Sequence, residues 1–140
     1  MKRTASARWK GGLQDGRGSL STASGVLDAA QYSFKTRFQD GKGTNPEELL
    51  GAAHAGCYSM ALSMILGEAG YTPEQIDTQA TVSLDEAEGG FAITAVHLDV
   101  TARVPGADTE AFKKAANDAK AGCPVSKVLN ARITMDAKLA

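Results

Sequence analysis

The chain has 140 residues, of which 43% are hydrophobic and 22% are charged, and its formal net charge is −1. This length predicts one domain, 1–140, with a sizeable core, and the near-neutral charge excludes any electrostatic basis for binding nucleic acid or an anionic membrane. Two cysteines are too few for a disulfide-stapled secreted scaffold or a structural zinc site. No apolar stretch follows the basic residues of the N-terminus, so we expect a cytoplasmic protein.

The first third of the chain predicts β-structure. Two strand-like runs, 7–11 and 18–27, flank a turn-rich segment and form a candidate hairpin. The run 31–38 then alternates and predicts a further strand. Its two faces hold different side chains: Tyr32, Phe34, Thr36 and Phe38 on one, Lys35 and Arg37 on the other.

A long helix is predicted to follow. Asn45 or Thr44 suits its N-cap, Pro46 fits its first position, and Glu47 and Glu48 complement its N-terminal dipole. Gly70 is expected to end it near Ala69.

The helix contains an uncharged run, 49–67, that is long enough to cross a membrane. The run holds glycines, serines and a histidine. Its flanks are acidic and lack both a basic anchor and an aromatic belt. We therefore expect a buried helix of a soluble protein.

Two strands are predicted next, over 75–86 and 91–104. The first alternates apolar and polar positions cleanly. In the second, the apolar parity changes between Ala95 and Val96, which indicates a bulge. Three elements complete the chain: an amphipathic helix within 105–122 capped by Asp108 or Thr109, a short helix over 123–130, and a last strand over 131–139.

Because strands and helices cluster rather than alternate, the fold class predicted is α+β with antiparallel sheets. The long helix is apolar or small on nearly every face, and two small sheets can hardly cover it all round. Its small residues would allow another backbone to approach closely. We therefore expect this helix to pack against its counterpart in a homodimer.

Two thiols are candidates for chemistry. Cys123 lies between Gly122 and Pro124, at the predicted start of a helix, where backbone N–H groups would favour a thiolate. Cys57 lies in the middle of the long helix, so a cation from elsewhere would have to activate it. Either cysteine could instead be a buried small residue. Two such thiols in a reducing compartment suggest a redox pair.

Three further residues are weaker candidates. His54 could assist Cys57, although a hydrogen-bonded core histidine is the more common case. Arg37 could be an ordinary solvated strand residue, and Glu47 could serve only the helix dipole. No metal-ligand spacing, phosphate-binding loop or nucleophile-elbow motif is present.

The run 42–70, "KGTNPEELLGAAHAGCYSMALSMILGEAG", resembles the OsmC/Ohr family of thiol peroxidases, and its OsmC branch most. Further matches occur in the same order over nearly the whole chain: "ARWKGGL", "GRGSLSTASGVL", "YSFKTRF", "SLDEAEGGFAI" and "KAGCPVSKVLNARITMD". The resemblance implies the OsmC-like α+β fold as an intertwined homodimer, with antiparallel sheets around a buried central helix and two sites at the subunit interface.

The resemblance also implies a peroxidase that reduces organic hydroperoxides, and hydrogen peroxide less efficiently. Cys57 would be the peroxidatic nucleophile and Cys123 the resolving thiol, joined in a disulfide during turnover. Arg37 and Glu47 would form the activating pair. No bound cofactor or metal is implied, and an external dithiol such as a lipoyl group would restore the enzyme.

One geometric consequence follows from these roles. On a regular helix Glu47 lies about 15 Å before Cys57, which one side chain cannot bridge. Either the first turns are irregular, or Arg37 and Glu47 reach Cys57 from the other subunit. Two alternatives to the peroxidase remain: a redox-sensing stress protein that binds peroxides or ligands without significant turnover, and a protein with two inert structural thiols.

Overall fold

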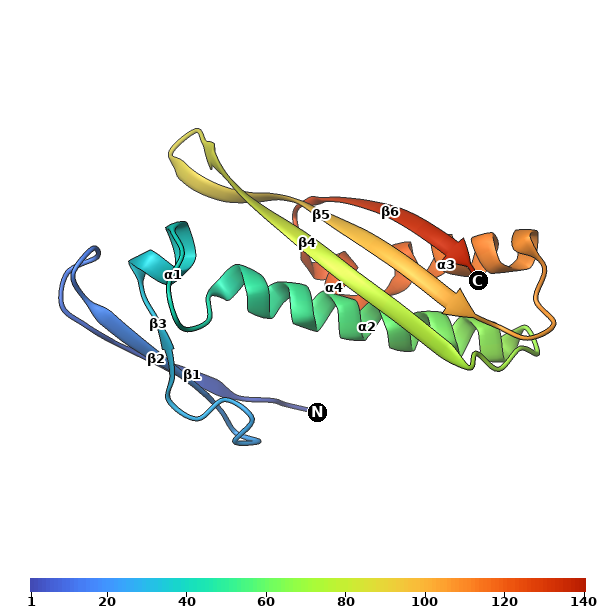
Figure 1. The fold of residues 1–140 in the computed structure, drawn as a ribbon, viewed down its shortest axis with the longest axis horizontal. Helices are drawn as coiled ribbons and strands as arrows, with labels where there is room; N and C mark the ends of the chain where they lie inside the picture. Colours follow the sequence, from blue (N-terminus) through green and yellow to red (C-terminus); the bar gives the residue numbers. More distant parts are fainter. The chain divides into compact units, whose positions relative to one another are not determined.

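The computed structural model describes residues 1–140, which form two compact units, Met1–Leu49 and Leu50–Ala140. Ten elements follow one another along the chain (Figure 1). The bounds of the first five are β1 Ala5–Lys10, β2 Arg17–Thr22, β3 Ala30–Tyr32, α1 Phe34–Phe38 and α2 Pro46–Glu68. Those of the last five are β4 Gln75–Ala87, β5 Gly90–Arg103, α3 Thr109–Gly122, α4 Pro124–Val128 and β6 Arg132–Leu139.

In the first unit, β1, β2 and β3 form an antiparallel sheet in that order. The predicted hairpin is confirmed, since β1 pairs with β2 from Ala5↔Thr22 to Lys10↔Arg17. The strand predicted over 31–38 is wrong beyond Tyr32, because the helix α1 replaces it.

The cause of this helix is local. Ser33 caps α1, accepting a hydrogen bond from the backbone N–H of Thr36, while the Thr36 hydroxyl accepts one from the N–H of Ser33. This reciprocal capping box satisfies two donors that a helix start leaves free. The helix that it stabilises therefore forms in place of the strand that the alternating pattern predicts.

The start of α2 agrees with prediction. Asn45 Oδ1 accepts a hydrogen bond from the backbone N–H of Glu48 at 2.7 Å, and Pro46 occupies the first helical position. After the helix, Gly70 adopts a positive φ of 91°. By length and composition α2 could also cross a membrane, but several of its side chains lie in a protein core: His54, Tyr58, Leu62 and Leu66 are buried.

The second unit is a three-stranded sheet with helices packed on one face. Figure 1 shows β4 and β5 as one long hairpin with β6 beside β5. Every second residue of β5 is buried from Val96 to Ala102, and the core cluster they join includes Leu62 of α2 and Phe112 of α3. Because only one side of β5 contributes, both helices cover the same face of the sheet.

The prediction of antiparallel sheets is confirmed for β4–β5 and wrong for β5–β6, which are parallel. A parallel pair needs a long crossover, and α3 and α4 supply it between β5 and β6. The predicted bulge is present. The pairing of β4 with β5 shifts between Ser83 and Leu84, which face Ala95 and Ile93 and leave Thr94 as the extra residue.

Candidate active site

The first unit holds an ion pair between Arg37 and Glu47. Arg37 Nε and Nη2 both donate hydrogen bonds to Glu47 Oε1, at 3.0 and 2.8 Å. The Glu47 side chain is 10% exposed and the Arg37 side chain 39% exposed. Since a guanidinium has five N–H donors, the carboxylate fixes its orientation and leaves other donors for a ligand.

The helical conformation of α1 changes which side chains accompany Arg37. In a strand, Arg37 would face away from Phe34 and Phe38. In a helix, positions 34, 37 and 38 lie on one face. The guanidinium carbon lies 5.6 Å from the centroid of the Phe38 ring, and the Phe34 and Phe38 centroids are 4.7 Å apart.

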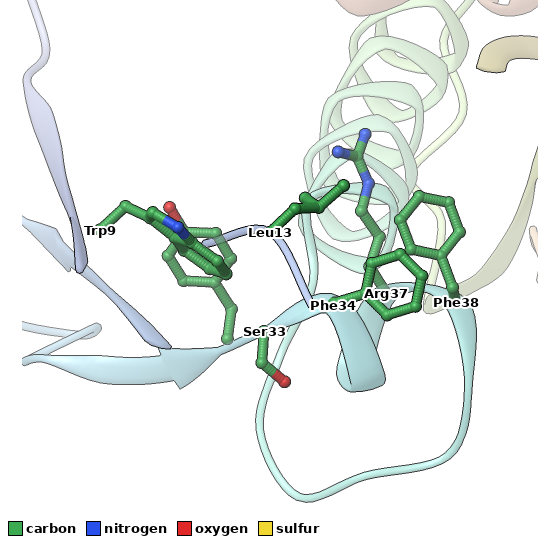
Figure 2. A pocket seen from close by; sticks show the side chains of 7 residues that line it. Trp9, Leu13, Ser33, Phe34, Arg37 and Phe38 are labelled. Carbon is green, nitrogen blue, oxygen red and sulfur yellow. The ribbon is translucent and has the colours of Figure 1, made fainter. Parts of the chain in front are cut away.

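These side chains form one wall of a pocket of about 290 Å³ in the first unit. Figure 2 shows the Arg37 side chain next to the rings of Phe34 and Phe38. Another wall is the Trp9–Tyr32 pair, with ring centroids 5.5 Å apart. The pocket is therefore largely aromatic and apolar with one guanidinium: its lining is Trp9, Leu13, Tyr32, Ser33, Phe34, Arg37 and Phe38.

The second unit brings the two cysteines together. Both are free thiols, Cys123 fully buried and Cys57 partly buried on α2. Their side chains interact directly, and the backbone N–H of Val125, at the start of α4, acts on both sulfurs. The two cysteines are 66 positions apart in sequence, and the packing of α4 against α2 brings them together.

The surroundings of the two thiols shift their pKa values in opposite directions. Burial raises the pKa of Cys57, and Cys123 raises it further, against an opposing backbone hydrogen bond from Val125. Burial also acts to raise the pKa of Cys123, but hydrogen bonds to its sulfur, first of all from Ser126, outweigh it and lower that pKa. Within one chain, these hydrogen bonds favour the thiolate form of Cys123.

Two polar side chains support Cys123. The backbone N–H of Ser126 donates to the Cys123 sulfur at 3.4 Å, and the Ser126 hydroxyl lies 3.4 Å from the same sulfur. The hydroxyl also shares a 2.7 Å hydrogen bond with His54 Nε2. His54 is fully buried, and burial lowers its pKa, so its imidazole is neutral at neutral pH.

The residues singled out from the sequence thus fall into two groups. Arg37 and Glu47 meet in the first unit, and Cys57 and Cys123 meet in the second. Sequence reasoning missed Ser126, although its position three residues after Cys123 is the spacing of an N-cap contact. It also missed Trp9 and Leu13, for which no local signal exists.

One polar cluster lies outside both groups, on the outer face of the second sheet. His97 Nε2 lies 3.3 Å from Asp99 and 3.2 Å from Asp136, and His97 Nδ1 lies 2.6 Å from the Thr134 hydroxyl. The three ionisable side chains could hold a metal ion by distance, but they are largely exposed. Contacts within the protein already account for both ring nitrogens.

Comparisons with known proteins agree with the motifs. The profile of the OsmC family, described as OsmC-like protein, matches residues 39–138. Peroxiredoxin OsmC of Escherichia coli is 57% identical over 133 residues, which cover 95% of this chain and 93% of that protein. Organic hydroperoxide resistance protein OhrB of Bacillus subtilis is 30% identical over 123 residues, covering 87% of this chain and 88% of its own.

Solved structures agree with the fold. The crystal structure of OhrB of Bacillus subtilis matches with a TM-score of 0.71 at 26% identity, covering 96% of this chain and 98% of that one. An OsmC-like protein of Vibrio cholerae matches with a TM-score of 0.76 at 15% identity, covering 98% and 99%. The two-sheet α+β architecture is therefore that of OsmC and Ohr proteins, and the chain belongs to the OsmC family.

Proposed function

We propose that the protein reduces organic hydroperoxides to alcohols, and hydrogen peroxide less efficiently, through a sulfenic acid at Cys57 and a disulfide with Cys123. It is an enzyme of the peroxiredoxin type, as the name of the E. coli relative indicates. The observation that carries the mechanism is the direct interaction of the Cys57 and Cys123 thiols. Two thiols that influence each other in this way can be joined in a disulfide after oxidation.

A peroxidatic Cys57 needs a positive charge, and the residues of its own unit that act on its pKa do not supply one. The groups that act on its pKa are burial, Val125 and Cys123, with no cation among them. Arg37 is the proposed source of this charge, oriented by Glu47. Helix α2 is unbroken from Pro46 to Glu68, which argues against irregular first turns. We therefore assign the Arg37–Glu47 pair that serves each Cys57 to the partner subunit.

The surface of α2 supports a homodimer. An exposed stripe of small and apolar residues runs along it, with Met60 77% exposed and Met64 59% exposed. A methyl group added to Gly56, on the same stripe, would meet no other part of the chain within 4 Å. A mid-helix glycine costs roughly 0.5–1 kcal/mol relative to alanine, so close approach of a second helix would explain its presence.

The proposed reaction has two chemical steps. The Cys57 thiolate attacks the terminal oxygen of the hydroperoxide, forming an S–O bond and breaking the O–O bond. The alkoxide leaves, Arg37 stabilises its developing charge, and it takes up one proton to become the alcohol. Cys123 then attacks the sulfenic sulfur, releases water and forms the disulfide. An external dithiol, such as a lipoyl group on a protein, reduces the disulfide again.

The pocket of the first unit favours organic substrates. Its aromatic lining and single guanidinium suit an apolar group attached to a polar peroxide head. Hydrogen peroxide lacks the apolar group and gains nothing from these walls. The preference for organic hydroperoxides thus rests on the lining and on the relatives named for hydroperoxide resistance.

The test is steady-state consumption of cumene hydroperoxide with lipoamide as reductant, run beside the variants Cys57→Ser and Cys123→Ser. Continuous turnover, faster than with hydrogen peroxide, supports the proposal. Consumption of one equivalent followed by arrest would favour the redox-sensing alternative. Equal and complete loss of single-turnover oxidation in both variants would refute the assigned roles of the thiols.

A further inference from the structure

The second unit contains a buried histidine that the proposed reaction does not use. His54 lies on α2, one turn before Cys57, and is fully buried. Its Nε2 shares a 2.7 Å hydrogen bond with the Ser126 hydroxyl, and its Nδ1 is buried without a partner. Ser126 in turn contacts the Cys123 sulfur through its backbone N–H and its hydroxyl. A continuous polar chain therefore runs from His54 through Ser126 to Cys123.

The unpartnered Nδ1 of His54 indicates which atoms donate the hydrogen bonds along this polar chain. A buried N–H without an acceptor is rarer in proteins than an under-satisfied acceptor, so the proton of the neutral imidazole belongs on Nε2. From there it donates to the Ser126 oxygen. The Ser126 hydroxyl proton is then directed at the Cys123 sulfur. Both Ser126 contacts thus become donors to that sulfur.

We propose that Ser126, held in place by His54, stabilises the thiolate of Cys123 and so assists the resolving step of the peroxidase. The inference rests on the proposed function for its place in the reaction. Ser126 touches the reacting sulfur, whereas His54 acts through Ser126 and is a positioning residue. The role of each differs from that of Arg37 and Glu47, which concern Cys57.

The hydrogen bonds to the Cys123 sulfur assist both the formation and the reduction of the disulfide. During resolution, the Cys123 thiolate forms the S–S bond while the S–O bond of the Cys57 sulfenic acid breaks, and the departing hydroxide takes up a proton as water. During reduction, a dithiol thiolate attacks the Cys57 sulfur and Cys123 leaves with the bonding electron pair. A thiol with a lower pKa leaves faster, so the same donors assist this step.

Other titratable groups facing Cys123 come from α2. The Cys57 thiol interacts with it directly, and the Tyr58 hydroxyl, which donates to the carbonyl of Ala116, has its pKa raised by burial and by Cys123. The sheet and α3 contribute apolar side chains to this core. The test therefore has to isolate Cys123 from Cys57.

The first measurement titrates Cys123 alone, in the Cys57→Ser background, by the ultraviolet absorbance of its thiolate. This readout needs neither peroxide nor access of a reagent to the buried sulfur. Adding Ser126→Ala or His54→Gln is expected to raise the pKa of Cys123, and Ser126→Thr, which keeps the hydroxyl, to restore it. An unchanged pKa in Ser126→Ala overturns the proposal whether or not the protein turns over peroxide.

The second measurement follows disulfide formation after one equivalent of hydroperoxide, in chains with both cysteines. For a pKa rise of about one unit, the thiolate fraction of Cys123 at neutral pH falls about tenfold. The greater nucleophilicity of the more basic thiolate offsets part of this loss, so disulfide formation in Ser126→Ala is expected to be about threefold slower. At alkaline pH, where Cys123 is ionised in both the wild type and the variant, the difference in rate disappears or reverses. Equal slowing at every pH would assign Ser126 a purely structural role and overturn the proposal.

Two control variants match these substitutions. Ser59→Ala removes a hydroxyl of α2 that is bonded to Thr78 and the Ala55 carbonyl, and His97→Gln removes the histidine on the outer face of the sheet. Neither is expected to alter the Cys123 titration. Failure of the wild-type chain to consume peroxide would refute the proposed function, while the titration would still decide the role of Ser126 and His54.

Discussion

The ion pair of the first unit supports a prediction that separates stability from activity. Arg37→Met removes the guanidinium but keeps a stem beside the Phe38 ring. Glu47 Oε1 then loses both of its hydrogen bonds, and Glu47 Oε2 is buried without a partner already. The variant therefore leaves an almost buried carboxylate with no cation.

The expected loss of stability follows from the exposure of the two side chains. Leaving one partner of a fully buried pair costs about 3–5 kcal/mol. Because 39% of the Arg37 side chain is exposed, water and salt offset part of this cost. We expect Arg37→Met to lower the free energy of unfolding by roughly 1–2 kcal/mol. Adding Glu47→Gln removes the uncompensated charge and should recover part of the loss.

Activity is expected to follow a different pattern. Loss of a charge-assisted donor at a reacting centre lowers rates by about 10²–10³-fold, so sulfenic acid formation in Arg37→Met should fall by at least a hundredfold. Glu47→Gln should cost less, because the amide oxygen still accepts from the guanidinium. The double variant should be no slower than Arg37→Met, since Glu47 acts through Arg37.

The assay combines urea unfolding with single-turnover sulfenic acid formation for the wild type, both single variants and the double variant. If Arg37 and Glu47 act as a pair, the effects of their two substitutions should be non-additive both in the free energy of unfolding and in the rate of sulfenic acid formation. If Arg37→Met loses stability but forms sulfenic acid at the wild-type rate, the pair is structural only. Additive losses of activity would equally contradict the reasoning, because they would give Glu47 an effect independent of Arg37.

Three other predictions address the thiols, the dimer and the buried histidine. Cys57→Ser should abolish hydroperoxide consumption, whereas Cys123→Ser should complete one oxidation and then accumulate sulfinic acid, detectable as added mass of two oxygen atoms. Gly56→Leu should yield a monomer by light scattering at micromolar concentration, because the position is unopposed within one chain but lies on the proposed dimer surface; an unchanged dimeric mass would contradict that surface. Because burial lowers the pKa of His54 in the folded state, the unfolded chain alone binds its proton just below pH 6.5, so wild-type stability should fall as pH drops through this range. His54→Gln should flatten this acid limb in urea unfolding.

The parts of the fold that depend on local chemistry were predictable from the sequence. Asn45 and Asp108 cap their helices through their own side chains, and Cys123 caps α4 with its sulfur. The parity change near Ala95 located the bulge to within one residue of Thr94. Each of these signals is contained in a few neighbouring residues, so no tertiary information is needed to read it.

The errors arose where one pattern fits two structures. Phe34 and Phe38 share a face in a strand, where side chains repeat every two residues, and in a helix, where positions four apart meet. Alternation could not separate the two, and the Ser33–Thr36 capping box decided for the helix. Similarly, the alternation of β6 carries no direction. Its parallel pairing follows from the crossover through α3 and α4.

The candidate site was predictable in its residues but not in its geometry. Family motifs pointed to Arg37, Glu47, Cys57 and Cys123, and the structure pairs them two by two. Ser126 was missed because a serine three residues after a cysteine has many uses, and only folding brings His54 to it from 72 residues away. Sequence patterns report on residues that are close together in the chain, whereas the contact between His54 and Ser126 depends on the packing of α4 against α2.

The two thiols differ in where their activation originates, and this difference has a consequence for assembly. Cys123 receives its hydrogen bonds from Ser126 in its own chain, so its lowered pKa needs no partner. Cys57 is held in its neutral form by burial and by Cys123, and the proposed counter-charge lies on another subunit. Under the proposed roles, a dissociated chain would keep the lowered pKa of Cys123, the resolving thiol, while Cys57, the peroxidatic thiol, stays protonated. Peroxide reactivity should then depend on protein concentration in the same range as dimerisation, which ties the proposed catalytic role of Arg37 to the oligomeric state.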